Sequence, residues 1–276
     1  MGSILDGAAP SSRPDNRELI KLIGERFISR KDVKAIQHRD GSWSPATDTG
    51  KHDGNRLPFT LEDFNRHLAG SLTLGHYMIG TDDTCKLFAF DIDLKKEGRY
   101  YPLDEATQFL DGGIEINPRE VWLDETHPGR DWLRIQLRCM AEGLAININR
   151  RLGIPVAVLD SGGKGLHVYG FTGTLPAVAV RASALSILDG LGCFEAVKGE
   201  NFFAHKWGKY ENIEIEVFPK QGSLEGKDLG NLMRLPLGKN QKTGKIASFI
   251  SMKNGYDQPW LSMDPLRALT GDLPWE

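Results

Sequence analysis

The stretch Lys86–Leu94 constrains the fold more than any other part of this sequence. It reads Lys-Leu-Phe-Ala-Phe-Asp-Ile-Asp-Leu, an apolar run that ends in two carboxylates. Because strand side chains alternate between two faces, Asp91 and Asp93 share one face with Ala89, and the other face carries Phe88, Phe90, Ile92 and Leu94. Two carboxylates beside an apolar run repel each other and lose hydration unless a positive charge lies between them. A divalent cation is the simplest source of that charge, although paired acids also occur at strand ends and solvated sheet edges.

One kind of metal site is excluded at this place. A calcium loop of the EF-hand type needs Asp or Asn at its fifth position and Gly at its sixth. Counted from Asp91, these positions hold Lys95 and Lys96. The two acids therefore predict a different metal site or none.

Composition narrows the class of protein. The 276 residues, 40% hydrophobic and 26% charged, are typical of a globular chain with one large domain or two packed modules. A net charge of -3 gives no overall basic field of the kind that nucleic-acid binders often have. Three cysteines without Cys-x-x-Cys spacing favour a reducing cytoplasm over disulfides or a zinc site. No signal peptide and no apolar run near membrane length is visible, so we expect a soluble protein with no membrane partner.

Helical and strand patterns alternate along the chain, which indicates an α/β or α+β sheet protein. Apolar spacing predicts helices at 16–27, 60–68, 131–152 and 176–191, and strands at 72–79, 86–94, 154–159, 168–171 and 213–218. The polar turn at 80–84 predicts a hairpin of the two strands around it. Residues 193–211 are interpreted as a basic, aromatic loop. We expect a disordered lead-in at 1–13, a core at 14–250 and a tail at 251–276.

A glycine-rich loop lies between two of the predicted strands. It reads Ser161-Gly162-Gly163-Lys164-Gly165-Leu166-His167. Glycines allow backbone N–H groups to turn toward an anion, and Lys164 adds a point charge for phosphate. A Walker loop is excluded because Gly165, and not Ser or Thr, follows the lysine. The loop therefore predicts phosphate binding, against the alternative of a tight structural turn.

The strand Ile213–Phe218 repeats the pattern of the first one. Its apolar residues share one face, and Glu214 and Glu216 share the other. The pattern alone does not decide which glutamate has a function, and a solvated sheet face remains the alternative. Five basic residues against one acid follow between Lys227 and Lys245, a local positive patch suited to a triphosphate or a nucleic-acid backbone.

Taken in order, these motifs resemble a known family. Asp-x-Asp after an apolar strand is followed by Ser-Gly-Gly-Lys-Gly-x-His, then by Glu-x-Phe-Pro-Lys-Gln, and then by Gly-Asn-x-x-x-Leu-Pro-Leu-Gly. This order is similar to that of the archaeo-eukaryotic primase superfamily, with closest similarity to primase-polymerases of TOTE conflict systems and of CRISPR systems. The resemblance covers about residues 60–240. Two positions depart from it, Tyr169 where Trp is common and Asn240 where His is common.

The resemblance implies an α+β fold, in which an α/β module packs on an RRM-like module with the active site in the cleft. It implies catalytic, metal-ligating roles for Asp91, Asp93 and Glu216, the last chosen over Glu214 by its Phe-Pro-Lys-Gln context. The residues that it implies for nucleotide binding are Ser161, Gly162, Gly163, Lys164, His167, Lys220 and Arg234.

The implied activity is template-dependent nucleotidyl transfer by a DNA primase or primase-polymerase. It would use NTP or dNTP, Mg²⁺ or Mn²⁺, and a single-stranded DNA template with its primer. Because no helicase segment is visible, unwinding would need a separate helicase. Phe202, Phe203 and Trp207, among basic residues that include Lys209, could stack on the template or belong to the core. Two rival functions remain, a metal-dependent nuclease or phosphohydrolase and a non-catalytic nucleotide- or RNA-binding module.

Overall fold

The computed structural model describes residues 16–51, 53–101, 113–199, 201–206, 210–256 and 258–275. The lead-in at 1–13, for which the sequence predicts disorder, lies outside these ranges. The helices are α1 (Arg17–Phe27), α2 (Leu61–Leu68), α3 (Pro118–Leu123), α4 (Gly129–Leu152), α5 (Ala177–Gly190) and α6 (Pro265–Thr270). The strands are β1 (Ala35–Gln37), β2 (Trp43–Pro45), β3 (Leu74–Tyr77), β4 (Thr84–Leu94), β5 (Gly98–Tyr100), β6 (Ile114–Ile116), β7 (Val156–Asp160), β8 (Gly165–Pro176), β9 (Cys193–Glu195), β10 (Phe202–His205), β11 (Ile213–Phe218), β12 (Leu232–Arg234), β13 (Ser248–Ser251) and β14 (Leu261–Ser262).

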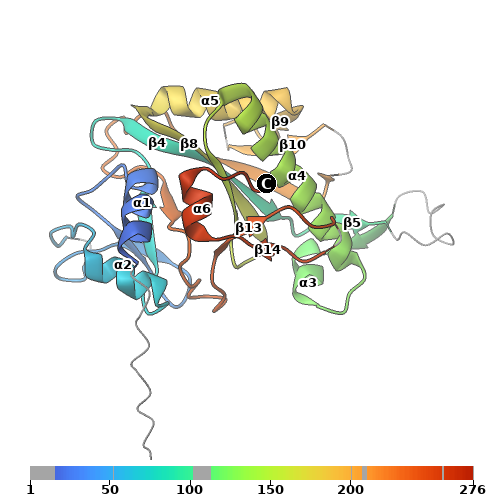
Figure 1. Ribbon diagram of the computed structural model, residues 1–276, viewed down its shortest axis with the longest axis horizontal. Coiled ribbons are helices and arrows are strands. Elements are labelled where there is room, and N and C mark those ends of the chain that lie inside the picture. The colour runs from blue at the N-terminus through green and yellow to red at the C-terminus, as the bar shows by residue number, and fades with distance from the viewer. Residues whose placement is uncertain are drawn as a thin grey trace, which may run out of the picture.

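Two sheets form the body of the protein (Figure 1). The large sheet has eight strands in the order β14-β13-β7-β8-β4-β11-β10-β9, and the small sheet has four in the order β12-β3-β1-β2. Strands β5 and β6 pair with each other in a separate ribbon. Helices together with several antiparallel sheets confirm the α+β class that the sequence predicts.

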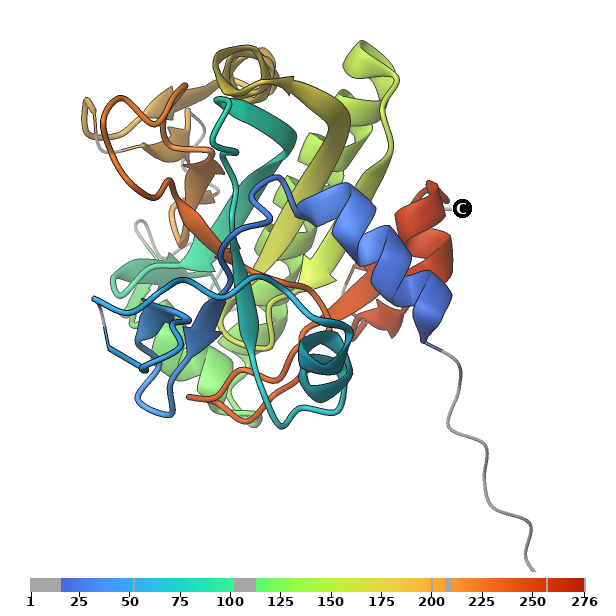
Figure 2. The same cartoon turned by 90° about the vertical axis from the view of Figure 1, so that its left-hand side faces the viewer.

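The large sheet is covered on one face by α4 and α5, which pack against each other (Figures 1 and 2). Phe90 and Ile92 of β4 and Leu133 and Leu144 of α4 are among the fully buried residues of this core. Burial of each such side chain contributes about 1.5–3 kcal/mol. This packing fixes the centre of β4, and with it the opposite face, on which the acids lie.

The predicted helices are confirmed, with local signals that explain their ends. Helix α2 begins with a capping box, in which Asp63 N–H donates to Thr60 Oγ1 (3.2 Å) and Thr60 N–H donates to Asp63 Oδ2 (2.9 Å). Helix α4 ends at Gly153, which has a left-handed φ of 63°. None of the helices in the described ranges is both long and apolar enough to cross a membrane.

The predicted hairpin of the strands around residues 80–84 is wrong. Strand β3 pairs with β1 and β12 of the small sheet, whereas β4 pairs with β8 and β11 of the large sheet. The turn itself forms, with Gly80 N–H donating to Thr84 O at 2.8 Å. A turn brings two strands close, but each strand here finds its partners elsewhere, and the chain passes from one sheet to the other at this turn.

The interpretation of residues 193–211 as a loop is also wrong in part, because β9 and β10 lie within them and extend the large sheet. Beyond residue 250, α6 packs against α1, and Leu269 is fully buried. The C-terminal residues described by the structure are thus integrated into the body of the protein.

Candidate active site

Strand β4 brings the motifs together, because it lies between β8 and β11. In the register of these strands, Asp91 is opposite His167 on β8 and Glu216 on β11. Asp93 is opposite Gly165 and Glu214 in the next row. Side chains in register on neighbouring strands point to the same face. The two acids, both glutamates and the histidine therefore share the face that α4 and α5 leave uncovered.

A cavity of about 220 Å³ lies between this face and the small sheet. The large sheet contributes Asp91 and His167 to its lining, and the small sheet contributes Arg234. The remaining lining residues are Gln37, Trp43, Phe218, Leu232 and Met233. Figure 2 shows the backbone of the two sheets that contribute these residues. Residues predicted for metal binding and for phosphate binding thus line one cavity.

Asp91 has one oxygen that is buried and one side open to the cavity. Its Oδ1 has no hydrogen-bond partner among the described residues, and His167 Nε2 lies 3.4 Å away. The other ring nitrogen of the histidine, Nδ1, is 2.9 Å from Tyr169 Oη, which fixes the orientation of the ring. Burial opposes the ionisation of Asp91, but His167, Lys164 and Arg234 outweigh it and lower the pKa of this carboxyl.

Lysine side chains form ion pairs with Asp93 and Glu216. Lys164 of the glycine loop contacts Asp93, and Lys220, just beyond β11, contacts Glu216. Burial, together with the charge of Asp91, raises the pKa of Asp93, although Lys164 opposes this shift. The carboxylates on this face repel one another and need nearby positive charge. The ammonium groups of Lys164 and Lys220 supply part of that charge.

The chemistry of these donors fits a divalent ion. Carboxylate oxygens are the ligands that Mg²⁺ and Mn²⁺ prefer, and the unpartnered Asp91 Oδ1 is one such donor. Across the described ranges, however, no three His, Cys, Asp or Glu side chains are grouped closely enough to hold an ion. Lys164 and Lys220 contact two of the three carboxylates that the sequence predicts as metal ligands. An ion held by Asp91, Asp93 and Glu216 would require these lysines to turn away.

Hydrogen bonds within the glycine loop give it a fixed shape. Gly162 N–H donates to Asp160 Oδ1 (2.9 Å), and Gly163 N–H donates to Ser161 Oγ (3.2 Å). Gly162 has a φ of 65°, which an L side chain rarely adopts, and a Cβ on Gly165 would collide with Ile92 O. The N–H groups of Gly162 and Gly163, which the sequence predicts to bind phosphate, therefore donate within the loop. Lys164 is the charged side chain of the loop.

Arg234 links the small sheet to the glycine loop, since its guanidinium donates to Ser161 O. The segment behind it is held by His67, whose Nε2 lies 2.9 Å from Pro236 O and whose Nδ1 accepts from Leu74 N–H (3.0 Å). These two bonds require the neutral ring with its proton on Nε2. Accordingly, burial lowers the pKa of His67 to about 4.

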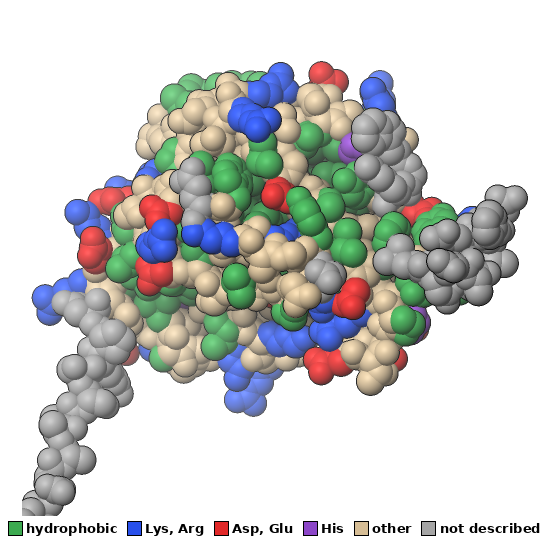
Figure 3. Space-filling model, turned by 45° about the vertical axis from the view of Figure 1, so that its right-hand side comes forward, with side chains coloured by type: hydrophobic (Ala, Val, Ile, Leu, Met, Phe, Trp, Pro, Cys, Tyr) green, Lys and Arg blue, Asp and Glu red, His purple; other side chains and the backbone are tan. Residues whose placement is uncertain are grey.

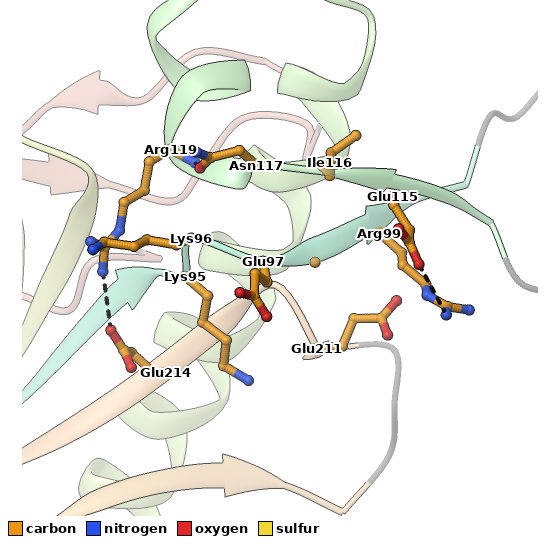
Figure 4. A pocket seen from close by; sticks show the side chains of 11 residues that line it. Lys95, Lys96, Glu97, Arg99, Glu115, Ile116, Asn117, Arg119, Glu211 and Glu214 are labelled. Carbon is orange, nitrogen blue, oxygen red and sulfur yellow. Dashed lines mark hydrogen bonds and ion pairs between the residues drawn. The ribbon is translucent and has the colours of Figure 1, made fainter.

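Glu214 has different surroundings from Glu216. Arg119 at the start of α3 lies 3.4 Å from Glu214 Oε1, and its Nε donates to Leu94 O (2.7 Å). Figure 4 shows the arginine reaching to the glutamate from above. Both residues line a separate pocket of about 840 Å³ beside the β5–β6 ribbon, with basic Lys95 and Arg99 and further acids. Contact with a local arginine therefore separates Glu214 from the cavity at Asp91.

The two described aromatic residues that the sequence predicts as template contacts have different surroundings. Phe203 on β10 is only 8% exposed and belongs to the core, as the structural alternative expected. Phe202 is opposite Glu216 in the sheet, and Lys220 Nζ lies 6.0 Å from the centre of its ring. Trp207 and Lys209 lie outside the described residues.

Sequence reasoning missed three residues of this region. Gln37 and Trp43 line the cavity from strands β1 and β2, in a stretch that reads as polar. Arg119 lies in a stretch rich in glycine, proline and acids that gave no clear pattern. A lone Trp among polar residues was the one available signal, and it does not specify which surface the ring contacts.

Comparison with known proteins agrees with this geometry. No curated protein matches the chain. The family model described as "TOTE conflict system, Archaeo-Eukaryotic Primase domain" matches residues 18–271. At the family level the function is primase-like nucleotidyl transfer, with nucleotide and nucleic-acid substrates and a general use of divalent metals. The chain belongs to the archaeo-eukaryotic primase domain family of TOTE conflict systems.

Proposed function

We propose that this protein is a template-dependent primase or primase-polymerase, which transfers NTP or dNTP to a 3′-hydroxyl on single-stranded DNA. One observation carries the proposal. Carboxylates from two separate motifs lie opposite each other on β4 and β11, beside His167 and within reach of Lys164, Lys220 and Arg234. Acids that can hold cations, next to basic side chains that can hold phosphate, are what nucleotidyl transfer requires.

In this proposal Asp91, Asp93 and Glu216 hold two Mg²⁺ or Mn²⁺ ions. When bound, such ions supply Lewis-acid activation of the attacking hydroxyl and neutralise charge at the leaving pyrophosphate. The protein's own contribution is position. Burial of β4 fixes the acids, and the Tyr169 hydroxyl fixes the ring of His167, whose Nε2 then faces Asp91.

The two lysines have a second role in the same proposal. Lys164 and Lys220 neutralise Asp93 and Glu216 in the structure described here. Once these carboxylates are engaged by other cations, the ammonium groups become available for the triphosphate, whose charge attracts them. Arg234, half-buried and bonded to Ser161 O, keeps its place at the cavity and limits where the phosphates can lie. The exchange keeps the charge of the site balanced in both states.

A primer-extension experiment tests the proposal. Purified protein is incubated with single-stranded DNA, with or without a primer, with NTP or dNTP and with Mn²⁺ or Mg²⁺. We expect templated products from the wild type, none from the Asp91→Ala/Asp93→Ala double variant, and normal products from Asp189→Ala, a control acid exposed on α5. Thermal unfolding of each variant checks that it is folded.

Three results would contradict the proposal in different ways. Product that persists in the double variant would remove β4 from the mechanism. Degradation of DNA without added nucleotide would favour a nuclease. Nucleotide binding that survives EDTA, with no product under any condition, would favour a non-catalytic binding module.

A further inference from the structure

A second cavity, of about 210 Å³, lies beside the glycine loop. Gly162 and Gly163 contribute to its lining, with Trp122 and Trp260 as aromatic walls and Arg130, Arg134 and Lys245 as basic groups. Among the described residues it has no lining residue in common with the cavity at Asp91. Nothing in the proposed chemistry uses this cavity.

The aromatic walls are held in position. The centres of the Trp122 and Trp260 rings are 6.0 Å apart, with their planes inclined by 34°. Trp122 Nε1 donates to Gly163 O (3.1 Å), which joins the wall to the glycine loop. The Arg130 guanidinium lies over the same Trp122 ring, 5.5 Å from its centre. A flat group that enters here would meet two indole surfaces and a cation.

The charges of the cavity call for an anion. Three basic side chains line it, of which Arg134 also contacts Asp131. The one lining acid is Asp160, whose carboxylate already accepts the Gly162 N–H and whose pKa is raised by burial. Arg130 Nε is buried and has no hydrogen-bond partner among the described residues, and its one ion pair, to Glu125, is long at 3.7 Å. A buried donor without a partner costs free energy, which an incoming acceptor would recover.

The segment that carries Trp260 is held by hydrogen bonds to a buried arginine. Arg138 on α4 is 2% exposed, and its guanidinium donates to Asn254 Oδ1 (2.9 Å), Gly255 O (2.8 Å) and Met252 O. Asn254 Nδ2 in turn donates to Pro259 O at 2.7 Å, directly before Trp260. The segment is therefore pre-organised, which lowers the entropy cost of binding on it.

We propose that this cavity binds one nucleotide of the single-stranded DNA template, with its base against Trp260 and Trp122 and a phosphate on Arg130, Arg134 and Lys245. Aromatic surfaces joined to a basic groove are how proteins hold single strands without reading sequence. The inference rests on the proposed function, because it assigns the template to one side of the glycine loop and the incoming nucleotide to the other. Figure 3 brings this side of the molecule forward and shows Lys and Arg side chains gathered toward the lower edge of the view.

The test measures DNA affinity without chemistry. Fluorescence anisotropy follows a labelled oligothymidylate in EDTA, with no nucleotide present. We expect Trp260→Ala to weaken binding about tenfold, as the loss of one stacked base does, and Trp260→Phe to retain part of the affinity. Arg130→Gln should weaken binding and reduce the slope of log Kd against log salt by about 0.7, as the loss of one phosphate contact does.

Matched controls separate the cavity from general effects. Leu261→Ala changes the neighbouring exposed apolar residue, and Arg150→Ala removes an exposed arginine from the far end of α4. Both should bind the oligonucleotide as the wild type does. Unchanged affinity in Trp260→Ala and Arg130→Gln, or equal losses in the controls, would overturn the proposal.

Two further measurements distinguish a failure of the template assignment from a failure of the proposed catalytic function. The Asp91→Ala/Asp93→Ala variant should bind DNA normally while making no product, so that a failure of the catalytic proposal leaves the binding result readable. Free dTTP is titrated against the wild type and Trp260→Ala in the same buffer. Binding of dTTP that depends on Trp260 would assign the cavity to free nucleotide and contradict the template assignment.

Discussion

The acids on the exposed face of the large sheet form two rows that differ in their surroundings. The first row is Asp91 and Glu216, and its Asp91 lines the cavity at Arg234, beside His167. The row of Asp93 and Glu214 lies one step further along the strands, where Arg119 contacts Glu214 and anchors on Leu94 O. Both rows have the same residue types at the same spacing. The residues opposite and beside each carboxylate, and not its type or spacing, therefore distinguish the surroundings of the two rows.

Exchange of one glutamate at a time tests this comparison most strongly. Glu216→Gln should lower nucleotidyl transfer by a factor on the order of 10³, since loss of a ligand removes several kcal/mol of charge stabilisation. Glu214→Gln, its matched control two residues away on the same strand, should change the rate less than about threefold. Single-turnover rates with saturating nucleotide measure both. Equal losses would show that Glu214 acts in the same site as Glu216.

His67, which holds the segment after Arg234 in the small sheet, gives a prediction for the pH dependence of stability. Unfolded His67 binds a proton below its ordinary pKa of 6.5, whereas the folded protein resists this until about pH 4. Between these values the unfolded state holds more protons, so stability falls as the pH decreases. The loss attributable to His67 approaches about 3 kcal/mol near pH 4. Denaturant titrations at neutral and acidic pH measure it.

The comparison of variants isolates that contribution. His67→Gln should flatten the pH dependence, whereas His38→Gln, at an exposed position, should leave it unchanged. His76, which is also buried with a pKa lowered to about 3, acts in the same direction, so the difference between variants is the relevant quantity. An identical slope in wild type and His67→Gln would show that burial does not lower the pKa of His67 in the folded protein.

The smallest effect concerns the second row. Arg119→Met removes a partly exposed ion pair and one hydrogen bond, which together contribute about 1 kcal/mol to the free energy of unfolding. Activity should remain within about twofold of the wild type. Lys21→Met, which removes an exposed pair on α1, is the control and should cost a few tenths of a kcal/mol. A large loss of activity in Arg119→Met would make Glu214 part of the chemistry.

Strand alternation explains why so much of the site could be predicted. It assigned Asp91 and Asp93 to one face of β4, and Glu214 and Glu216 to one face of β11, with no knowledge of the sheet. It could not reveal that β4 lies between β8 and β11, because lateral order arises from contacts between distant segments. For the same reason the turn at 80–84 misled, since a local signal cannot show that each strand has a better partner elsewhere.

The choice between the two glutamates shows the same limit. The strand pattern of Ile213–Phe218 does not distinguish them. The family resemblance favours Glu216 through its Phe-Pro-Lys-Gln context, whereas the contact that sets Glu214 apart comes from Arg119, almost a hundred positions earlier in the chain. Trp260 and Arg130 likewise belong to one cavity only because Arg138 fixes the C-terminal segment. Long-range contacts of single polar residues leave no periodic trace in a sequence.

Arg138 also sets where this chain can be shortened. The motifs end near Gly238, so a fragment that stops at residue 250 would contain all of the proposed catalytic residues. It would nevertheless lose every carbonyl that accepts from this interior guanidinium. Stranding a buried charge costs about 3–5 kcal/mol, a large fraction of the 5–15 kcal/mol that holds a typical protein folded. Carbonyl oxygens of residues 252–255 thus solvate a guanidinium more than a hundred positions earlier in the chain, and we expect a fragment that stops at residue 250 to be unstable.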